Sequence, residues 1–235
     1  SAAGRRKGER TRDRLKLAAI DLLDEIGYRD MRISDICERA DVSTATFYLY
    51  YQNKTEITVE VLREFMDTIF GVAETDGPYR SSFDAIYSAN LGWIRTVKAN
   101  AGLLRCLLQV GDQTPEFAEV SQTINFKWYG RVASSIHRSL SDERGRGADL
   151  SLVLAYALGS MMDELCRRLF VAQDQHLVDL IAKVAPTDED LAELIGVIWF
   201  RTVYCADPPG VKTKPAAQLL LLKQLRPALP KKSAR

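Results

Sequence analysis

One stretch of the sequence, residues 39–54, restricts the possible folds of this chain more than any other. It reads RADVSTATFYLYYQNK and predicts a tight turn, a short helix, a second turn and the start of another helix. Ser43 is a suitable N-cap, because its hydroxyl can accept a hydrogen bond from an unpaired first-turn amide. Phe47 is the plain apolar anchor of the short helix, and most of its neighbours are small or carry hydroxyls. Small side chains, hydroxyls and a helix N-terminus suit phosphate oxygens and base edges, so the stretch is typical of a helix that enters the DNA major groove.

The residues before this stretch predict two further helices. From Leu15 to Ile26, apolar residues recur every three or four positions, and Gly27 follows where a left-handed C-cap would close the helix. From Ile33 to Ala40, the same spacing predicts a second, shorter helix. Three helices with a tight turn between the last two form a helix-turn-helix unit.

Residues 11–54 resemble the N-terminal domain of the TetR/AcrR family of bacterial transcriptional regulators. The resemblance covers about the first quarter of the chain, without gaps, and is carried by these positions: Ala18, Ala19, Leu22, Leu23, Gly27, Tyr28, Ile36, Val42, Ser43, Thr46, Phe47, Tyr48, Tyr50, Tyr51 and Lys54. Asp41 and Ala45 stand where the family commonly has glycine, and Tyr51 stands where phenylalanine is usual. Met31-Arg32 replaces a threonine that usually caps the second helix. Asp41 is compatible with the turn, because Asp can adopt the left-handed conformation.

The resemblance implies how the chain contacts DNA. Thr44 and Ala45 are expected to contact base edges, with thymine methyl groups as targets. Ser34, at the start of the second helix, is expected to contact a base or a phosphate. Four further residues are expected to contact phosphates: Thr46, Tyr48, Tyr50 and Lys54.

Charge is distributed unevenly along the chain, although the formal net charge is only +1. Residues 1–16 carry seven basic and two acidic side chains, and residues 206–235 carry seven and one, so residues 17–205 have a net charge of −10. A basic N-terminal arm can neutralise phosphates or enter a minor groove, which makes affinity salt-dependent. The alternative is a solvated, disordered terminus, which is the simpler interpretation of the C-terminal tail.

Several classes of protein are disfavoured by the composition. No apolar run is long enough to span a membrane and no signal-peptide region is present, so we expect a cytoplasmic protein. The four cysteines are scattered, and His137 and His176 are solitary, so neither metal ligation nor a catalytic triad is indicated. There is no glycine-rich phosphate loop and no dinucleotide fingerprint. We therefore expect no catalytic residue, no metal and no cofactor.

From Thr55 onward the sequence predicts helices alone, because no stretch shows sustained alternation of apolar and polar residues. The expected fold is all-α, with an N-terminal three-helix DNA-binding domain and a larger helical domain for ligand binding and dimerisation. The expected divisions are a flexible basic arm at 1–10, the helix-turn-helix domain at 11–58, the effector-binding and dimerisation domain at 59–205, and a basic tail at 206–235.

Two late helices are strongly apolar. One runs from about Asp149 to Ala172, and the other starts at Thr187, which forms a capping box with Asp190. The first is apolar or small almost without interruption over 152–162, so it must be buried on more than one side. This suggests a four-helix bundle with the same helices of a second subunit, as the resemblance also implies. The alternative is that both helices fill the core of the monomer.

Aromatic and methionine side chains gather on the helices predicted for the larger domain. Such residues with one or two polar groups can line a small-molecule site, although at helical spacing they often form plain core. The resemblance favours the site, since family members typically bind an effector inside this bundle. The candidates are Tyr87, Trp93, Phe117, Asn125, Trp128, Tyr129, Met161, Met162 and Leu165.

The expected function is that of a homodimeric repressor, released from a near-palindromic double-stranded DNA operator by a small hydrophobic effector. The helix from Thr55 to Phe70 is the expected lever, because it joins the two domains. One alternative is an effector-independent DNA-binding protein whose second domain only dimerises. Another is a carrier or enzyme for hydrophobic molecules that has kept a helix-turn-helix-like start.

Overall fold

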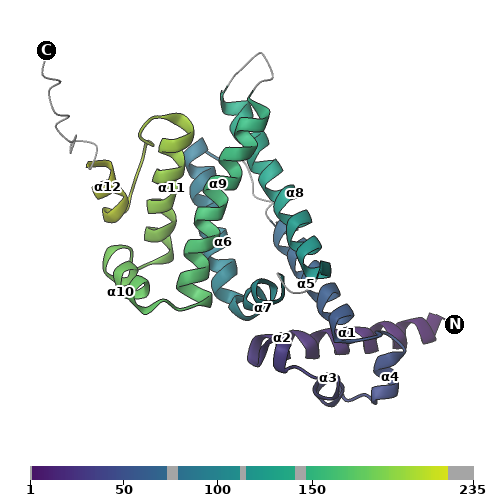
Figure 1. Ribbon diagram of the computed structural model, residues 1–235. Helices are drawn as coiled ribbons and strands as arrows, with labels where there is room; N and C mark the ends of the chain where they lie inside the picture. Colours follow the sequence, from purple (N-terminus) through teal and green to yellow (C-terminus); the bar gives the residue numbers. More distant parts are fainter. Residues whose placement is uncertain (1, 73–78, 112–114, 141–146, 222–235) are drawn as a thin grey trace, which may run out of the picture. The chain divides into compact units, whose positions relative to one another are not determined.

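The computed structural model of the chain describes residues 2–72, 79–111, 115–140 and 147–221, and every regular element in these ranges is a helix (Figure 1). The expected all-α fold class is confirmed. The helices are α1 (Ala2–Glu25), α2 (Gly27–Asp30), α3 (Ile33–Arg39), α4 (Thr44–Tyr48), α5 (Lys54–Val72), α6 (Ser82–Ala99), α7 (Ala101–Gly111), α8 (Pro115–Leu140), α9 (Ala148–Cys166), η1 (Arg167–Val171, a π-helix), α10 (Gln175–Val184), α11 (Asp188–Tyr204) and α12 (Lys214–Leu221). Residues 222–235 of the expected tail lie outside the described residues.

Two helix starts follow the predicted capping residues. The Ser43 hydroxyl accepts a hydrogen bond from the Thr46 backbone N–H at 3.1 Å and so caps α4. At α11, the Asp190 N–H donates to the Thr187 hydroxyl at 3.0 Å, and the Thr187 N–H donates to the Asp190 carboxylate at 3.2 Å. These reciprocal bonds form the predicted capping box.

Two helical segments differ from the sequence-based expectation. Helix α1 begins at Ala2, so residues 2–10 are helical where we expected a flexible arm. The segment is rich in Arg, Lys and Glu, which are good helix formers, and contains no proline. Helix α10 is absent from the sequence-based prediction, although Leu177, Leu180, Ile181 and Val184 have helical spacing.

The chain divides into two compact units. Unit 1 comprises residues 1–77 and 96–173, and unit 2 comprises residues 78–95 and 174–235. Unit 1 therefore contains the N-terminal helices together with α7, α8 and α9. The expected functional division after residue 58 stays a prediction, because compactness alone does not separate DNA binding from effector binding.

The core of unit 1 continues from the N-terminal helices into α7 and α8. Leu15, Phe47 and Leu62 are completely buried in the same cluster as Phe117 of α8. Helix α1 packs against both α5 and α7, and α8 packs along α9 (Figure 1). The N-terminal helices thus lack a separate core of their own, and their packing depends on α7 and α8.

Gly102 of α7 lies directly against the backbone of Asp24 in α1. A Cβ atom at this position would be 2.6 Å from the Asp24 Cα. That distance is much shorter than van der Waals contact, and a backbone atom cannot move aside as a flexible side chain can. The close packing of α1 on α7 therefore requires glycine at position 102.

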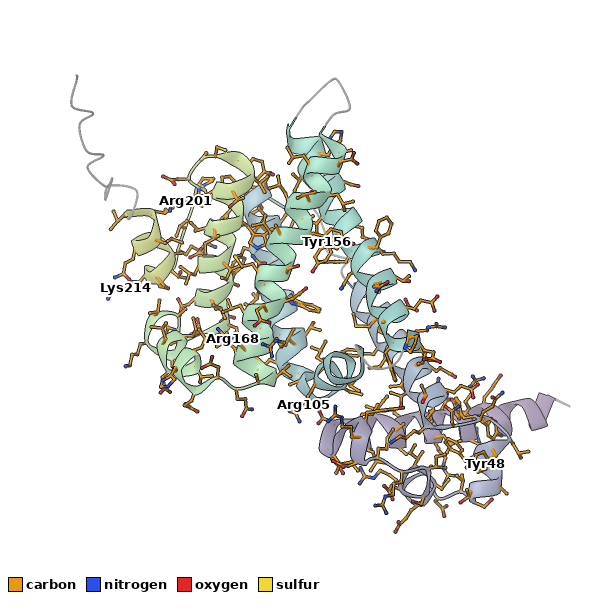
Figure 2. All side chains as sticks on the ribbon, in the orientation of Figure 1. Tyr48, Arg105, Tyr156, Arg168, Arg201 and Lys214 are labelled. Atoms are coloured by element: carbon orange, nitrogen blue, oxygen red, sulfur yellow. The ribbon has the colours of Figure 1, made fainter. Side chains whose placement is uncertain are left out.

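Unit 2 is built on α6, α11 and α12. The rings of Phe83 and Phe200 pack edge to face, with centroids 5.8 Å apart. Arg201, labelled in Figure 2, donates to the carbonyl oxygens of Leu219 and Leu220 at 3.0 and 3.1 Å. These bonds hold the C-terminal turn of α12 to α11, so residues up to 221 of the expected tail pack on unit 2. No helix in the described ranges is long and apolar enough to cross a membrane.

Candidate DNA-binding surface

Helix α4 has one buried side chain and a largely exposed outer surface. Phe47 is completely buried, whereas Tyr48 is 56% exposed and Leu49, the C-cap residue, is 81% exposed. Thr44 and Ala45 are also exposed. Figure 2 shows Tyr48 on α4 among the N-terminal helices. Because the two predicted base-reading side chains are small and uncovered, the first turn of α4 can approach another surface closely.

The turn between α3 and α4 is held by Arg14 of α1. Its guanidinium donates to the Ala40 carbonyl oxygen, and to the Asp41 carbonyl oxygen and carboxylate at 3.0 and 3.2 Å. Asp41 has a φ of 50°, the left-handed conformation that the turn requires. The replacement of the usual glycine by Asp41 is therefore accommodated, as expected.

The start of α3 is capped without a threonine. The Arg32 backbone N–H donates to the Asp35 carboxylate at 3.0 Å, and Met31 is completely buried in the core. Ser34 is exposed beside this carboxylate, and its hydroxyl donates to it at 3.1 Å. The departure at Met31-Arg32 thus keeps the helix start and leaves Ser34 accessible.

Lys54, at the N-terminus of α5, has a structural environment that the sequence did not indicate. Its ammonium donates to the carbonyl oxygens of Tyr28, Met31 and Arg29 at 2.9, 3.0 and 3.2 Å. It also lies 4.6 Å from the centroid of the Tyr28 ring. A cation at the C-terminal end of α2 is favourable, because unpaired carbonyls gather there. Lys54 therefore ties α5 to α2, and its phosphate contact stays a prediction.

Thr46 and Tyr50 are half-buried, unlike the exposed Thr44 and Tyr48. The Thr46 hydroxyl lies 2.9 Å from the Ser43 hydroxyl. The Tyr50 hydroxyl faces α1, since a Cβ atom at Gly8 would lie 3.5 Å from it. The structure thus divides the seven predicted DNA contacts into two groups. The exposed ones are Ser34, Thr44, Ala45 and Tyr48, and the half-buried ones are Thr46, Tyr50 and Lys54.

Ion pairs made by Arg12 and Lys16 tie α1 to α5, and no sequence pattern points to them. Arg12 donates to the Glu60 carboxylate at 2.6 Å and, through Nε, to the Tyr51 hydroxyl at 3.2 Å. Lys16 donates to the Glu64 carboxylate at 2.8 Å. Each pair joins residues 48 positions apart, so no local pattern reveals it. Together they fix the angle at which α5 leaves the N-terminal helices.

Replacing Tyr51 by phenylalanine should reduce the loss of stability at alkaline pH. Burial raises the pKa of Tyr51 to about 12, against 10.0 for a free tyrosine. Between these values the unfolded chain releases the phenolic proton and the folded chain keeps it, so stability falls as pH rises. Two pKa units correspond to about 2–3 kcal/mol. Urea unfolding from pH 8 to 12 should show a shallower decline for the variant, and identical declines would contradict the raised pKa.

The predicted effector-binding residues are distributed over both units. Tyr87 and Trp93 belong to unit 2, and the other seven belong to unit 1. Phe117 is completely buried and meets Tyr28 of α2 edge to face, with ring centroids 5.5 Å apart. It therefore packs in the core beneath the N-terminal helices, and Asn125 is exposed on α8.

The remaining candidates of unit 1 lie on α8 and α9. Tyr129 is buried, and its hydroxyl donates to the Asp163 carboxylate at 2.6 Å. Its ring centroid is 4.4 Å from that of Tyr156, and burial raises the pKa of the Tyr129 phenol. Gly159 provides space for this ring, because a Cβ atom there would lie 2.8 Å from Tyr129 Cζ. Met162 is buried, and the last three are half-buried: Trp128, Met161 and Leu165.

Residues 17–61, from the middle of α1 to α5, match the sequence model of a family described as bacterial regulatory proteins, tetR family. This match includes the exposed first turn of α4, its N-cap and its buried anchor. Over these residues, the chain is similar to the TetR family.

A curated relative is similar over a comparable length of the chain. The chain is 34% identical over 59 residues to a fatty acid metabolism regulator protein of Bacillus subtilis, a match that covers 25% of this chain and 30% of that protein. The similarity thus spans less than a third of that relative. Both the matched relative and the matched family are described as regulators.

Solved structures extend the similarity of fold to most of the chain. A transcriptional regulator from Rhodococcus sp. Rha1 superposes with a TM-score of 0.65 at 16% identity, covering 85% of this chain and 99% of that one. A regulator from Saccharomonospora viridis, solved in complex with choline, has a TM-score of 0.54 at 22% identity, with 72% and 94% coverage. These likenesses concern the fold.

Proposed function

We propose that this chain is a transcriptional repressor of the TetR family that places α4 in the major groove of its operator. The exposed first turn of α4 within the family match carries this proposal. Thr44 and Ala45 would contact base edges, and Ser34 would contact a base or phosphate at the start of α3. Such a regulator acts at the chromosome, which in bacteria means the cytoplasm.

Binding to DNA from upstream of the chain's own gene tests the proposal. Purified protein should bind this DNA tightly in the presence of excess unrelated DNA. If it does not, a selection from random genomic fragments should recover one shared near-palindromic sequence. Recovery of no enriched sequence would contradict sequence-specific binding.

We also propose a homodimer that reads the two halves of a near-palindromic operator. Leu150 and Val153 of α9 are apolar and 58% and 63% exposed, and their spacing of three positions puts them on one face. An exposed apolar face on a long helix is suited to a partner subunit. Sedimentation of the full chain should give twice the mass of one chain.

A small hydrophobic effector would release the repressor from DNA. Support for a hydrophobic effector comes from the buried aromatic and methionine side chains of α6, α8 and α9. Support for a small-molecule ligand in general comes from the structural relative that was solved with choline. The effector can shift the protein only by its difference in affinity for the DNA-competent and DNA-incompetent states. A compound that lowers operator affinity in proportion to its own binding would support this part of the proposal. A compound panel that never changes operator affinity would favour effector-independent binding.

Replacing Lys54 by alanine should weaken binding to all DNA sequences alike, by about tenfold, because one phosphate loses its cation and α2 is loosened. The plot of log affinity against log salt concentration should also become less steep, by about 0.9 for each phosphate that is no longer neutralised. Fluorescence anisotropy with operator and unrelated duplexes at several salt concentrations measures both effects. An unchanged slope with reduced affinity would mean that Lys54 acts only by holding α2.

A further inference from the structure

The buried face of α6 carries one polar side chain at its centre. Asn90 is only 5% exposed. It lies one helical turn from Ile86 and Tyr87 on one side and from Trp93 and Ile94 on the other. Phe83, Ile94 and Val97, on the same face, are buried and apolar. An amide in the middle of an apolar face is costly unless it is hydrogen-bonded.

Two N–H groups on this face are shielded from water and have no hydrogen-bond partner among the described residues. They are the Asn90 side-chain amide and the indole N–H of Trp93. Residues three positions apart on a helix are neighbours, so both donors belong to one patch. Buried polar groups in folded proteins are nearly always paired. Two unpaired donors within one turn of the same helix therefore indicate a missing hydrogen-bond acceptor.

The charges around α6 favour a neutral acceptor. Arg95, the basic residue of α6 closest in sequence to Asn90, is paired with Glu189 of α11 at 2.5 Å. Burial raises the pKa of Tyr87, and the carboxylates of Glu189 and Glu193 raise it further. These carboxylates would repel an anion, and the two unpaired donors are themselves uncharged. A buried carboxylate without a cation would be poorly stabilised here.

We propose that Asn90 and Trp93 donate hydrogen bonds to a neutral carbonyl oxygen of the effector. The effector class is then an apolar molecule with an ester, amide, lactone or ketone group, and not a fatty acid. The apolar side chains beside Asn90 would contact the hydrocarbon part. This assignment rests on the proposed function, because it presupposes that unit 2 takes part in effector binding.

A series of matched probe compounds tests the assignment on the full chain. The probes are methyl esters of C6–C10 fatty acids, the free acids, and alkanes of equal length, with binding followed by calorimetry. The wild-type chain should bind at least one ester about tenfold more tightly than its acid and its alkane, the usual gain from one neutral hydrogen bond. Asn90→Leu should remove this preference and leave alkane binding unchanged. Trp93→Phe, which keeps an aromatic ring without the N–H, should reduce it in part.

The stability of the ligand-free protein gives a second readout. Asn90→Leu removes an unpaired buried donor, so the Tm of this variant should rise. Binding-site residues often lower the stability of the ligand-free protein, and replacing them then stabilises it. The matched control is Asn100→Leu, whose amide donates to the Thr96 carbonyl oxygen at 2.9 Å, so its Tm should fall and ester preference should persist. A lower Tm for Asn90→Leu with unchanged ester preference would overturn the assignment and leave the effector proposal intact. Failure of every probe to bind the wild-type chain would overturn the assignment, while the compound panel against operator affinity would still test the effector proposal separately.

Discussion

Replacing Thr44 by glutamate should abolish specific DNA binding without lowering the stability of the protein. Thr44 is exposed in the first turn of α4, so a larger side chain at this position can extend into solvent. A carboxylate at this helix N-terminus is favourable in the free protein, because it faces unpaired amides. Against DNA it would meet phosphates and base edges at close range. We expect operator affinity to fall at least about 100-fold, as for a like charge in an interface.

The matched control for this variant is Thr123→Glu, at an exposed threonine of α8. It adds the same charge outside the candidate DNA-binding surface, so operator affinity should change little. Electrophoretic mobility shifts and thermal unfolding of both variants separate loss of binding from loss of folding. Retained operator binding by Thr44→Glu would remove α4 from the interface.

Replacing Gly102 by alanine should destabilise unit 1 by about 1–3 kcal/mol or more, the cost of overpacking a fixed backbone contact. The added Cβ would overlap the backbone of Asp24, so α7 or α1 must move. Urea unfolding followed by circular dichroism measures the change. Because the core beneath the N-terminal helices is shared with α7, operator affinity should also fall.

The control is Gly92→Ala on α6, where an added Cβ has no neighbour within 4 Å. Alanine is the better helix former by about 1 kcal/mol, so this variant should be stabilised. Opposite changes in the free energy of unfolding for the same substitution in two helices would show that the interhelical contact, and not helix propensity, decides the result. Equal stabilisation of both variants would show that α1 does not pack closely on α7.

Local features of the fold are readable from the sequence. Ser43 and Thr187 are predictable as caps, because a cap depends on residues within three positions. The burial of Phe47 follows from its apolar side chain among small and hydroxyl-bearing neighbours. The family match at 17–61 likewise reflects a short, continuous pattern.

Contacts between distant segments are not readable in the same way. The carbonyls of α2 accept from Lys54 across 23–26 positions, and Arg12 reaches Glu60 across 48. Phe117 packs on Tyr28, and the sequence does not indicate this contact, because an aromatic residue at helical spacing does not reveal which helix will cover it. Its contact with a ligand stays a prediction. Asn90 has no signal in the sequence, because its significance lies in hydrogen-bond partners that it lacks among the described residues.

The division of tasks within α4 has a consequence for how such proteins diverge. Phe47, with Tyr51 just beyond the helix, supplies the burial that keeps α4 in place, and neither side chain is exposed. Thr44, Ala45 and Tyr48 are exposed and contribute little to the core. After a gene duplication, substitutions at the exposed positions can therefore accumulate while each successive variant still folds. Descendants of one ancestral regulator can acquire new operators while inheriting the same scaffold.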